Sequence, residues 1–232
     1  MSQNWRSSDQ SSDDVRTRRV TFAAADDGPT LTGVLHLPEK GGGPFPAAVV
    51  CHPHTQMGGN MGNGIVVSLC LELAVAGWAA LRFNFRGAGS SEGSFDGGDG
   101  WTRPPKELGD VKGAVDFLFV QTEIDPGELA VIGYSFGAGI ALHHAARDHR
   151  LDHMVGIALV KQHYGDPFLD GDRRPKLFVA GEEDPYAPAE ALREYVDALD
   201  PPKRLHIVGG AGHLFSGHVR EVTNVTIEWL TG

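Results

Sequence analysis

Serine, aspartate and histidine residues in the second half of the chain have the types and order needed to attack a carbonyl carbon. Ser135 stands between Gly133 and Gly137, where the apolar run ELAVIGY meets the helical pattern GAGIAL. A tight turn from strand to helix lifts a serine above the sheet edge, and only small residues fit two positions away on either side. The free N–H groups at the start of the helix favour developing negative charge. The sequence therefore predicts Ser135 as a nucleophile.

A second serine, Ser91, also has flanking glycines, in the stretch GSSEG over 89–93. It lies inside a glycine-rich loop predicted over 86–100, and no helix follows it directly. Because the strand-to-helix context is missing, Ser91 is interpreted as a loop residue.

A serine hydroxyl attacks only when a base takes its proton and an acid orients that base. After such a turn, the expected order along the chain is serine, acid, histidine. Asp184 follows the predicted strand KLFVAG, at the carboxyl end where open α/β sheets place their ligands. Pro185 begins a turn that can hold a short acidic side chain in place, which favours Asp184 over its neighbours Glu182 and Glu183.

The base must follow Asp184, and only three of the 11 histidines do so: His206, His213 and His218. His206 lies within the predicted strand RLHIV, and His218 lies in or near the last predicted helix. His213 follows GGAG just past that strand, on a loop above the sheet. We therefore predict His213 as the base, since Ser135, Asp184 and His213 then meet at one sheet edge.

A tetrahedral intermediate also needs hydrogen-bond donors for its oxyanion. The residue after the nucleophile, Phe136, is expected to supply one backbone N–H. The second is expected from the loop over 51–63, where the N–H of His54 is favoured and Thr55 competes. His52 and His54 lack an acidic or cysteine cluster in register, so no metal is expected there. No cofactor is expected either.

The elements that must position these residues alternate along the chain. Strands are predicted at 17–24, 30–38, 45–52, 78–85, 128–134, 153–161, 176–181 and 203–210. Helices are predicted at 63–77, 106–121, 137–148 and 188–199, with a last one beginning near His213. After an antiparallel hairpin, this alternation predicts an α/β fold with a mostly parallel sheet and helices on both faces. Residues 1–16 are predicted to be a disordered polar tail, and 17–232 a single domain.

Composition narrows the function classes. The 232 residues carry a formal net charge of −10 and no basic cluster, so a nucleic-acid partner is not expected. No apolar run approaches the roughly 18 residues of a membrane span, and the first residues lack the apolar core of a secretory signal. The two cysteines, Cys51 and Cys70, are expected to be buried thiols. A cytoplasmic protein without a membrane partner is therefore predicted.

The same residues resemble the α/β-hydrolase superfamily and, within it, the compact lidless predicted esterases related to dienelactone hydrolases. Four segments carry the resemblance, which covers about 17–232: HPHTQMGGNMGN, FNFRGAGSSEG, GYSFGAGIAL and GEEDPYAP with GAGHLFSGH. It implies an eight-stranded sheet without a cap domain and a Ser135, Asp184 and His213 triad. Dienelactone hydrolases proper use cysteine at the position of Ser135, so lactone chemistry is not carried over.

The predicted function is hydrolysis of a small carboxylic ester through an acyl-enzyme. A thioesterase, a peptidase-like acyl hydrolase with the same triad, and a non-catalytic ligand-binding protein are the alternatives. The short stretch over 162–175 leaves no room for a helical cap, which predicts an open cleft. Trp101, Tyr164 and Phe168 are candidates to line it.

Overall fold

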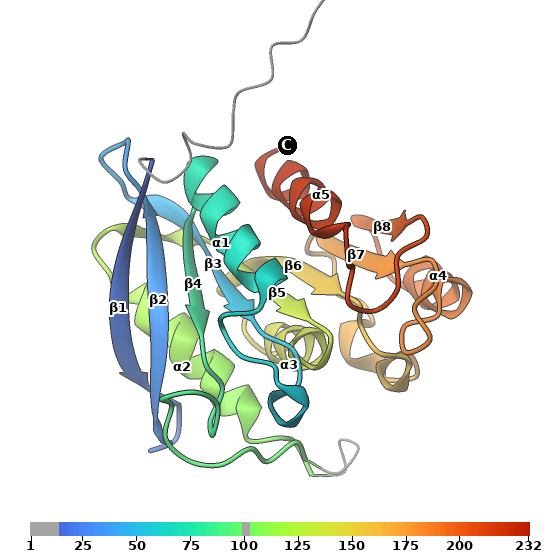
Figure 1. Ribbon diagram of the computed structural model, residues 1–232, viewed down its shortest axis with the longest axis horizontal. Helices are drawn as coiled ribbons and strands as arrows, with labels where there is room; N and C mark the ends of the chain where they lie inside the picture. The colour runs from blue at the N-terminus through green and yellow to red at the C-terminus, as the bar shows by residue number, and fades with distance from the viewer. Residues whose placement is uncertain (1–13, 99–102) are drawn as a thin grey trace, which may run out of the picture.

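One eight-stranded sheet forms the centre of the protein in the computed structural model, which describes residues 14–98 and 103–232 (Figure 1). The strands are β1 (Val15–Ala23), β2 (Thr30–Pro38), β3 (Phe45–Cys51), β4 (Ala79–Phe83), β5 (Ile124–Tyr134), β6 (Leu151–Ile157), β7 (Lys176–Gly181) and β8 (Lys203–Val208). Their order is β1-β2-β4-β3-β5-β6-β7-β8. β2 runs antiparallel to β1 and β4, while β4, β3 and β5 to β8 are parallel. The predicted mostly parallel sheet with an antiparallel hairpin is confirmed.

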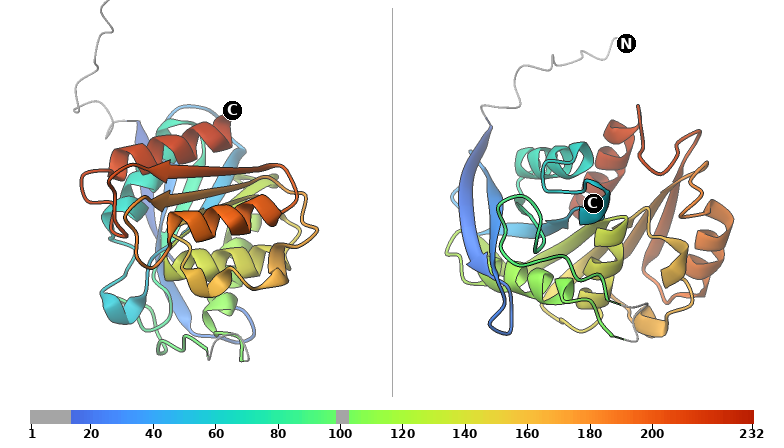
Figure 2. Two further views of the ribbon diagram at one scale, coloured as in Figure 1. Left: turned by 90° about the vertical axis from the view of Figure 1, so that its right-hand side faces the viewer. Right: turned by 60° about the horizontal axis from the view of Figure 1, so that its bottom comes forward.

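Helices cover both faces of the sheet, as predicted. The helices are α1 (Gly64–Val75), α2 (Glu107–Phe119), α3 (Phe136–Ala145), α4 (Ala189–Ala198) and α5 (Val219–Thr231). Figure 2 shows α1 and α5 on one face, with α2, α3 and α4 on the other. Central strands such as β3 are apolar throughout because both of their faces are buried.

The carboxyl ends of the parallel strands lie at one edge of the twisted sheet (Figure 1). The loops after β3, β5, β7 and β8 therefore start at the same side of the sheet. The segment between β6 and β7 contains just two short 3-10 helices, η2 (Lys161–His163) and η3 (Pro167–Leu169). No cap domain is inserted there, in agreement with the prediction.

Several predicted boundaries differ from the structure, and three of them have a clear cause or consequence. β1 begins at Val15, so Val15 and Arg16 of the expected tail pair with β2, while residues 1–13 lie outside the described part. β6 ends at Ile157 rather than 161, because Ala158 takes a φ of 48°. The prediction that the last helix begins near His213 is wrong, since α5 begins at Val219. Phe215 and Gly217 have positive φ values of 50° and 80°, which a right-handed helix does not allow.

The two cysteines are buried and free, as expected. None of the helices among residues 14–98 and 103–232 has the length and apolar character needed to cross a membrane.

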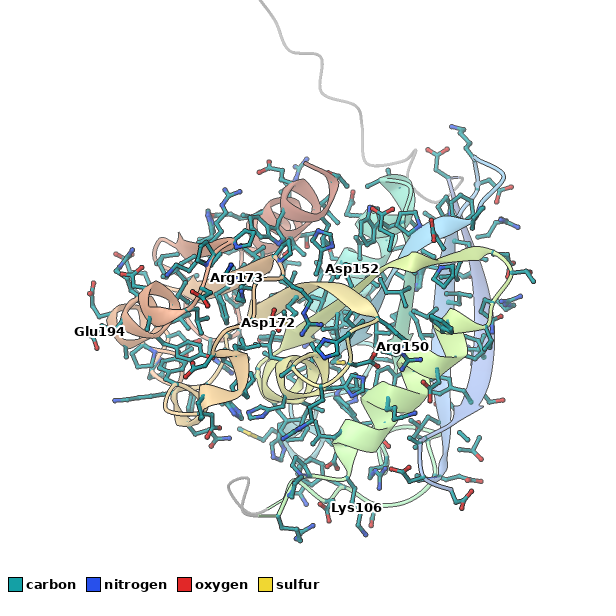
Figure 3. All side chains as sticks on the ribbon, turned by 180° about the vertical axis from the view of Figure 1, so that it is seen from behind. Lys106, Arg150, Asp152, Asp172, Arg173 and Glu194 are labelled. Carbon is teal, nitrogen blue, oxygen red and sulfur yellow. The ribbon has the colours of Figure 1, made fainter. Side chains whose placement is uncertain are left out.

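A cluster of charges joins α2 to the end of α3. Arg150 contacts Asp148 at 2.6 Å and Asp116 of α2 at 2.8 Å, and Figure 3 shows Arg150 beside α2. Burial raises the pKa of Asp148, but the hydrogen bonds and charge of Arg150 outweigh burial and lower it to about 2. A carboxylate with a lowered pKa stabilises the fold at pH values above its ordinary value near 3.8, and the effect is lost as the pH falls toward 2.

Asp148→Asn is therefore expected to lower the free energy of unfolding by about 2 kcal/mol at pH 7, since each pKa unit corresponds to about 1.4 kcal/mol. Urea unfolding of both proteins between pH 7 and 3 measures this, and the difference should narrow below about pH 4. Exposed Asp197→Asn serves as the control and should change little. A difference independent of pH would contradict the assignment to the Asp148 charge.

Candidate active site

Ser135 lies directly between β5 and α3, where the backbone turns sharply. Its φ of 56° and ψ of −120° are a conformation that residues other than glycine rarely adopt. The Ser135 N–H donates to the carbonyl of Ile157 in the neighbouring strand at 2.8 Å, which ties the strained residue to the sheet. The turn places the side chain at the start of α3, above the carboxyl edge of the sheet.

The two flanking glycines are required by close backbone approaches. A Cβ atom at Gly133 would collide with the carbonyl oxygen of Gly137 and with Ala138 Cα. A Cβ atom at Gly137 would collide with the carbonyl oxygens of His52 and Cys51, at the end of β3. The glycine spacing thus brings α3 against both its own strand and the loop after β3.

The structure brings Ser135, His213 and Asp184 together in one hydrogen-bonded chain. Ser135 Oγ lies 2.9 Å from His213 Nε2, and His213 Nδ1 lies 2.7 Å from Asp184 Oδ2. Because an ionised carboxylate only accepts, Nδ1 carries the proton and Nε2 is left to accept the serine proton. The three side chains come from the loops after β5, β7 and β8, as the sequence predicted.

Asp184 is held in place by more than the histidine. Its other oxygen, Oδ1, accepts hydrogen bonds from the N–H groups of Tyr186 at 2.8 Å and Ala187 at 3.0 Å. Burial of Asp184, which is 3% exposed, raises its pKa. The hydrogen bonds from His213 and the two N–H groups outweigh this effect, so the pKa of Asp184 lies below its ordinary value. The carboxyl group therefore stays ionised and orients the imidazole.

The competing residues lie elsewhere. Ser91 Oγ donates to the carbonyl of Asn84 at 2.7 Å and accepts from Thr32 N at 2.9 Å, which makes it a loop-bracing residue. Glu182 accepts from Gly210 N, and Glu183 is exposed. His206 and His218 both face Glu221, at 2.9 and 3.9 Å.

Tyr134 supports the histidine and was not identified from the sequence. Its hydroxyl donates to the backbone carbonyl of His213 at 2.8 Å, which fixes the loop after β8 against β5. Phe215, fully buried, anchors the other side of that loop and lies near the Tyr134 ring. The position of Tyr134 beside the serine in the motif was the only signal that could have indicated this contact.

The two residues predicted as oxyanion donors both lie in the cleft with Ser135. Phe136 begins α3, and its ring contacts that of His54 with centroids 5.0 Å apart. Within the described chain, neither backbone N–H donates to another residue, so both can bind an added oxygen atom. Thr55, the competitor, begins the 3-10 helix η1 (Thr55–Met57) and does not line the cleft.

His52 shapes the loop that carries His54. Its Nδ1 lies 2.6 Å from the carbonyl oxygen of Pro53, and its Nε2 accepts from the N–H of Phe85 at 3.0 Å. These partners require a proton on Nδ1 alone, and burial lowers the pKa of His52 to about 4, which keeps it neutral. His52 therefore links the loop after β3 to the segment that follows β4.

A buried ion pair supports the loop after β4 on the same side of the sheet. Arg86 Nη2 lies 2.6 Å from Asp110 Oδ1, and the Arg86 N–H and Nε also donate to the same carboxylate. Asp110 belongs to the first turn of α2, where Glu107 accepts from the N–H groups of Asp96 and Gly97. The first turn of α2 thus anchors the loop after β4.

The cleft at Ser135 has a volume of about 400 Å³. Its surface is mostly apolar, and Lys161 and Gln162 add polar groups to those of His54, Ser135 and His213. The full lining comprises His54, Met57, Ser135, Phe136, Val160, Lys161, Gln162, Pro185, Tyr186 and His213. Met57 and Tyr186 are exposed at its mouth, and sequence reasoning did not identify them. Lys161 also borders a second hollow of about 570 Å³, whose lining includes Asp166, Asp170, Glu194 and Tyr195.

Of the residues expected to line the cleft, Tyr164 and Phe168 do not. Tyr164 stacks on Tyr195 and donates to the carbonyl of Leu159, while Phe168 stacks on His143. The segment after β6 turns them toward α3 and α4 instead. Trp101 lies outside the described residues.

Known proteins show the same architecture. The crystal structure of ATU1826 from Agrobacterium tumefaciens, a protein of unknown function put forward as an α/β hydrolase, is 30% identical. Its superposition covers 92% of this chain and 94% of that one, with a TM-score of 0.80. XC6422 from Xanthomonas campestris, an α/β serine hydrolase without a lid, is 26% identical with a TM-score of 0.77, over 93% and 94% of the two chains. The uncharacterised protein RP471 of Rickettsia prowazekii is 30% identical over 80% of this chain and 78% of its own.

The family comparison agrees with the fold. Residues 27–194 match the family model of the X-Pro dipeptidyl-peptidases, the S15 peptidase family. This match covers well over half of the chain, and the lidless fold is that expected from the resemblance to the α/β hydrolases. The chain therefore belongs to the X-Pro dipeptidyl-peptidase (S15) family of the α/β-hydrolase superfamily, a family of serine hydrolases.

Proposed function

We propose that this protein is a serine esterase that hydrolyses small carboxylic esters through an acyl-enzyme. The observation that carries the proposal is the hydrogen-bonded chain from Ser135 through His213 to Asp184. It ends at a serine that lies in an open cleft and at the N-terminus of a helix.

In the proposed reaction, Ser135 Oγ forms a bond to the ester carbonyl carbon while His213 Nε2 takes the hydroxyl proton. The carbonyl oxygen becomes an oxyanion and receives hydrogen bonds from the N–H groups of Phe136 and His54. Collapse of the intermediate breaks the bond to the alcohol, which takes the proton from His213 as it leaves. Water then attacks the acyl-serine with the same base, and the carboxylic acid and free Ser135 are released.

The cleft supports an ester with an apolar acyl or alcohol group. Met57, Phe136, Val160 and Pro185 offer apolar surface around Ser135, and Tyr186 lies across the His213 ring with centroids 5.0 Å apart. Lys161 is the single charged side chain among the described residues of the lining. A neutral or anionic substrate therefore fits this cleft better than one with an ammonium group beside the scissile bond. The thioester alternative uses the same groups.

Peptidase activity is the second candidate, because the family model is that of X-Pro dipeptidyl-peptidases. A substrate cleaved at its second residue carries a free ammonium group, which needs carboxylates nearby. The adjoining hollow offers Asp166, Asp170 and Glu194 beyond Lys161. Turnover of an X-Pro anilide in place of p-nitrophenyl esters would favour this candidate.

The prediction of a cytoplasmic enzyme stays a prediction.

The nucleophile is tested by intact mass after incubation with a fluorophosphonate, which reacts with serines activated by histidine. We expect one adduct on the wild type and on Ser91→Ala, and none on Ser135→Ala. Ser91→Ala is the matched control, because Ser91 has the same flanking glycines but a bracing role. An unlabelled, folded wild type would instead favour a ligand-binding protein without catalysis.

A further inference from the structure

Two histidines and an aspartate converge behind the cleft, and the proposed reaction does not use them. His143 lies on α3, His163 ends η2, and Asp166 precedes η3. One donor atom from each side chain can be chosen so that all three lie within 4.8 Å of one another. The residues come from two separate segments of the chain, so the convergence is a product of the tertiary fold.

One pair of atoms in this cluster already has the spacing of two ligands on a single metal ion. His143 Nε2 lies 3.5 Å from Asp166 Oδ2. Two ligands of tetrahedral zinc, each about 2.0–2.1 Å from the ion, lie ~3.3 Å apart. Imidazole nitrogens and carboxylate oxygens are the donors that Zn²⁺ takes in sites with three protein ligands.

The cluster is built into the protein rather than placed on its surface. His143 and His163 are 4% and 2% exposed. The ring of His143 stacks on Phe168 with centroids 3.7 Å apart, which fixes its orientation. His163 packs directly on Gly139 of α3, where a Cβ atom would collide with its ring. The two imidazoles therefore have restricted positions before any ion arrives.

The cluster borders a hollow in the protein surface on the side of Asp166. Asp166 lines the hollow of about 570 Å³, and its side chain is 32% exposed, while its Oδ2 atom is buried and accepts no hydrogen bond within the described chain. This hollow offers a route by which an ion would reach the cluster. The same ion would join α3 to the segment over 161–166, whose Lys161 and Gln162 line the cleft.

We propose that His143, His163 and Asp166 form a binding site for a divalent transition-metal ion of the zinc type, which clamps the wall of the active cleft to α3. The site is separate from the serine chemistry and does not depend on the proposed function. The metal is a clamp rather than a participant in ester cleavage.

The test is titration of the chelator-treated protein with Zn²⁺ by calorimetry, together with the visible spectrum of the Co²⁺ form. We expect one ion per chain and the intense bands of tetrahedral Co²⁺. Saturation at about 100 times the dissociation constant should raise Tm by about 5–10 °C. His163→Gln and Asp166→Asn should each weaken binding more than about 100-fold, because loss of an outer partner alone costs about 10–100-fold.

His144→Gln is the matched control, since His144 is a buried histidine of the same helix that pairs with Asp148 at 3.1 Å instead. It should bind Zn²⁺ as the wild type does. Asp166 is partly exposed, so Asp166→Asn is expected to fold, which circular dichroism verifies. Failure of the wild type to bind one ion, or equal binding by Asp166→Asn, would overturn the proposal.

Discussion

Ser135→Ala is expected to lower kcat/KM for a p-nitrophenyl ester by about 10⁵–10⁶-fold, with little change in stability. Removal of a triad serine takes away the covalent route and leaves the oxyanion donors and binding alone. The Ser135 backbone keeps its φ of 56°, because its N–H is bonded to Ile157 and the flanking glycines remain. Initial rates over a range of ester concentrations measure the loss.

Asp184→Asn should cost about 10⁴-fold in kcat, since the amide no longer stabilises the imidazolium or selects the tautomer with a proton on Nδ1. The double variant Ser135→Ala/Asp184→Asn should lose no more than Ser135→Ala alone, because the residues act as one unit. Multiplicative losses in the double variant would show that Asp184 acts independently of Ser135. Circular dichroism of each variant verifies that the fold is retained.

Asp110→Asn is expected to lower the free energy of unfolding by about 3–5 kcal/mol, the largest effect on stability that we predict. The carboxylate is fully buried and accepts four hydrogen bonds from Arg86, whose side chain is 10% exposed. Removing one partner leaves the guanidinium charge buried and uncompensated. Urea unfolding at pH 7 measures the change.

Two further variants distinguish the loss of the buried ion pair from a general destabilisation of α2. Lys112→Ala breaks the exposed pair with Asp116 on the same helix and should cost about 0.3–0.5 kcal/mol. Arg86→Met/Asp110→Leu removes both charges and should recover much of the loss, because apolar replacements of a buried pair are often neutral. A double variant less stable than Asp110→Asn would show that the loop needs the hydrogen bonds themselves.

Strand-end logic predicted the residues that assemble at Ser135. Parallel strands bring their carboxyl ends to one edge, so Asp184 and His213 could be placed beside Ser135 without knowing any side-chain contact. The spacing of Gly133 and Gly137 around Ser135 could be interpreted for the same reason. In this fold class the turn from strand to helix brings neighbouring backbone close to both positions.

Residues whose positions depend on irregular backbone could not be predicted. The segment after β6 was expected to border the cleft, but it has no periodicity. Nothing therefore indicated that Lys161 and Gln162 would face the cleft while Tyr164 and Phe168 turn away. The start of α5 was predicted too early because the positive φ of Phe215 has no sequence signature.

The order of the site residues along the chain also determines when catalysis can begin during protein synthesis. Ser135 lies near the middle of the chain, whereas His213 follows the last strand. A nascent chain that has already folded β1 to β7 therefore presents its serine hydroxyl without a base. Hydrolysis should start only after β8 has left the ribosome and paired with β7, which would make the onset of activity a reporter of completed folding.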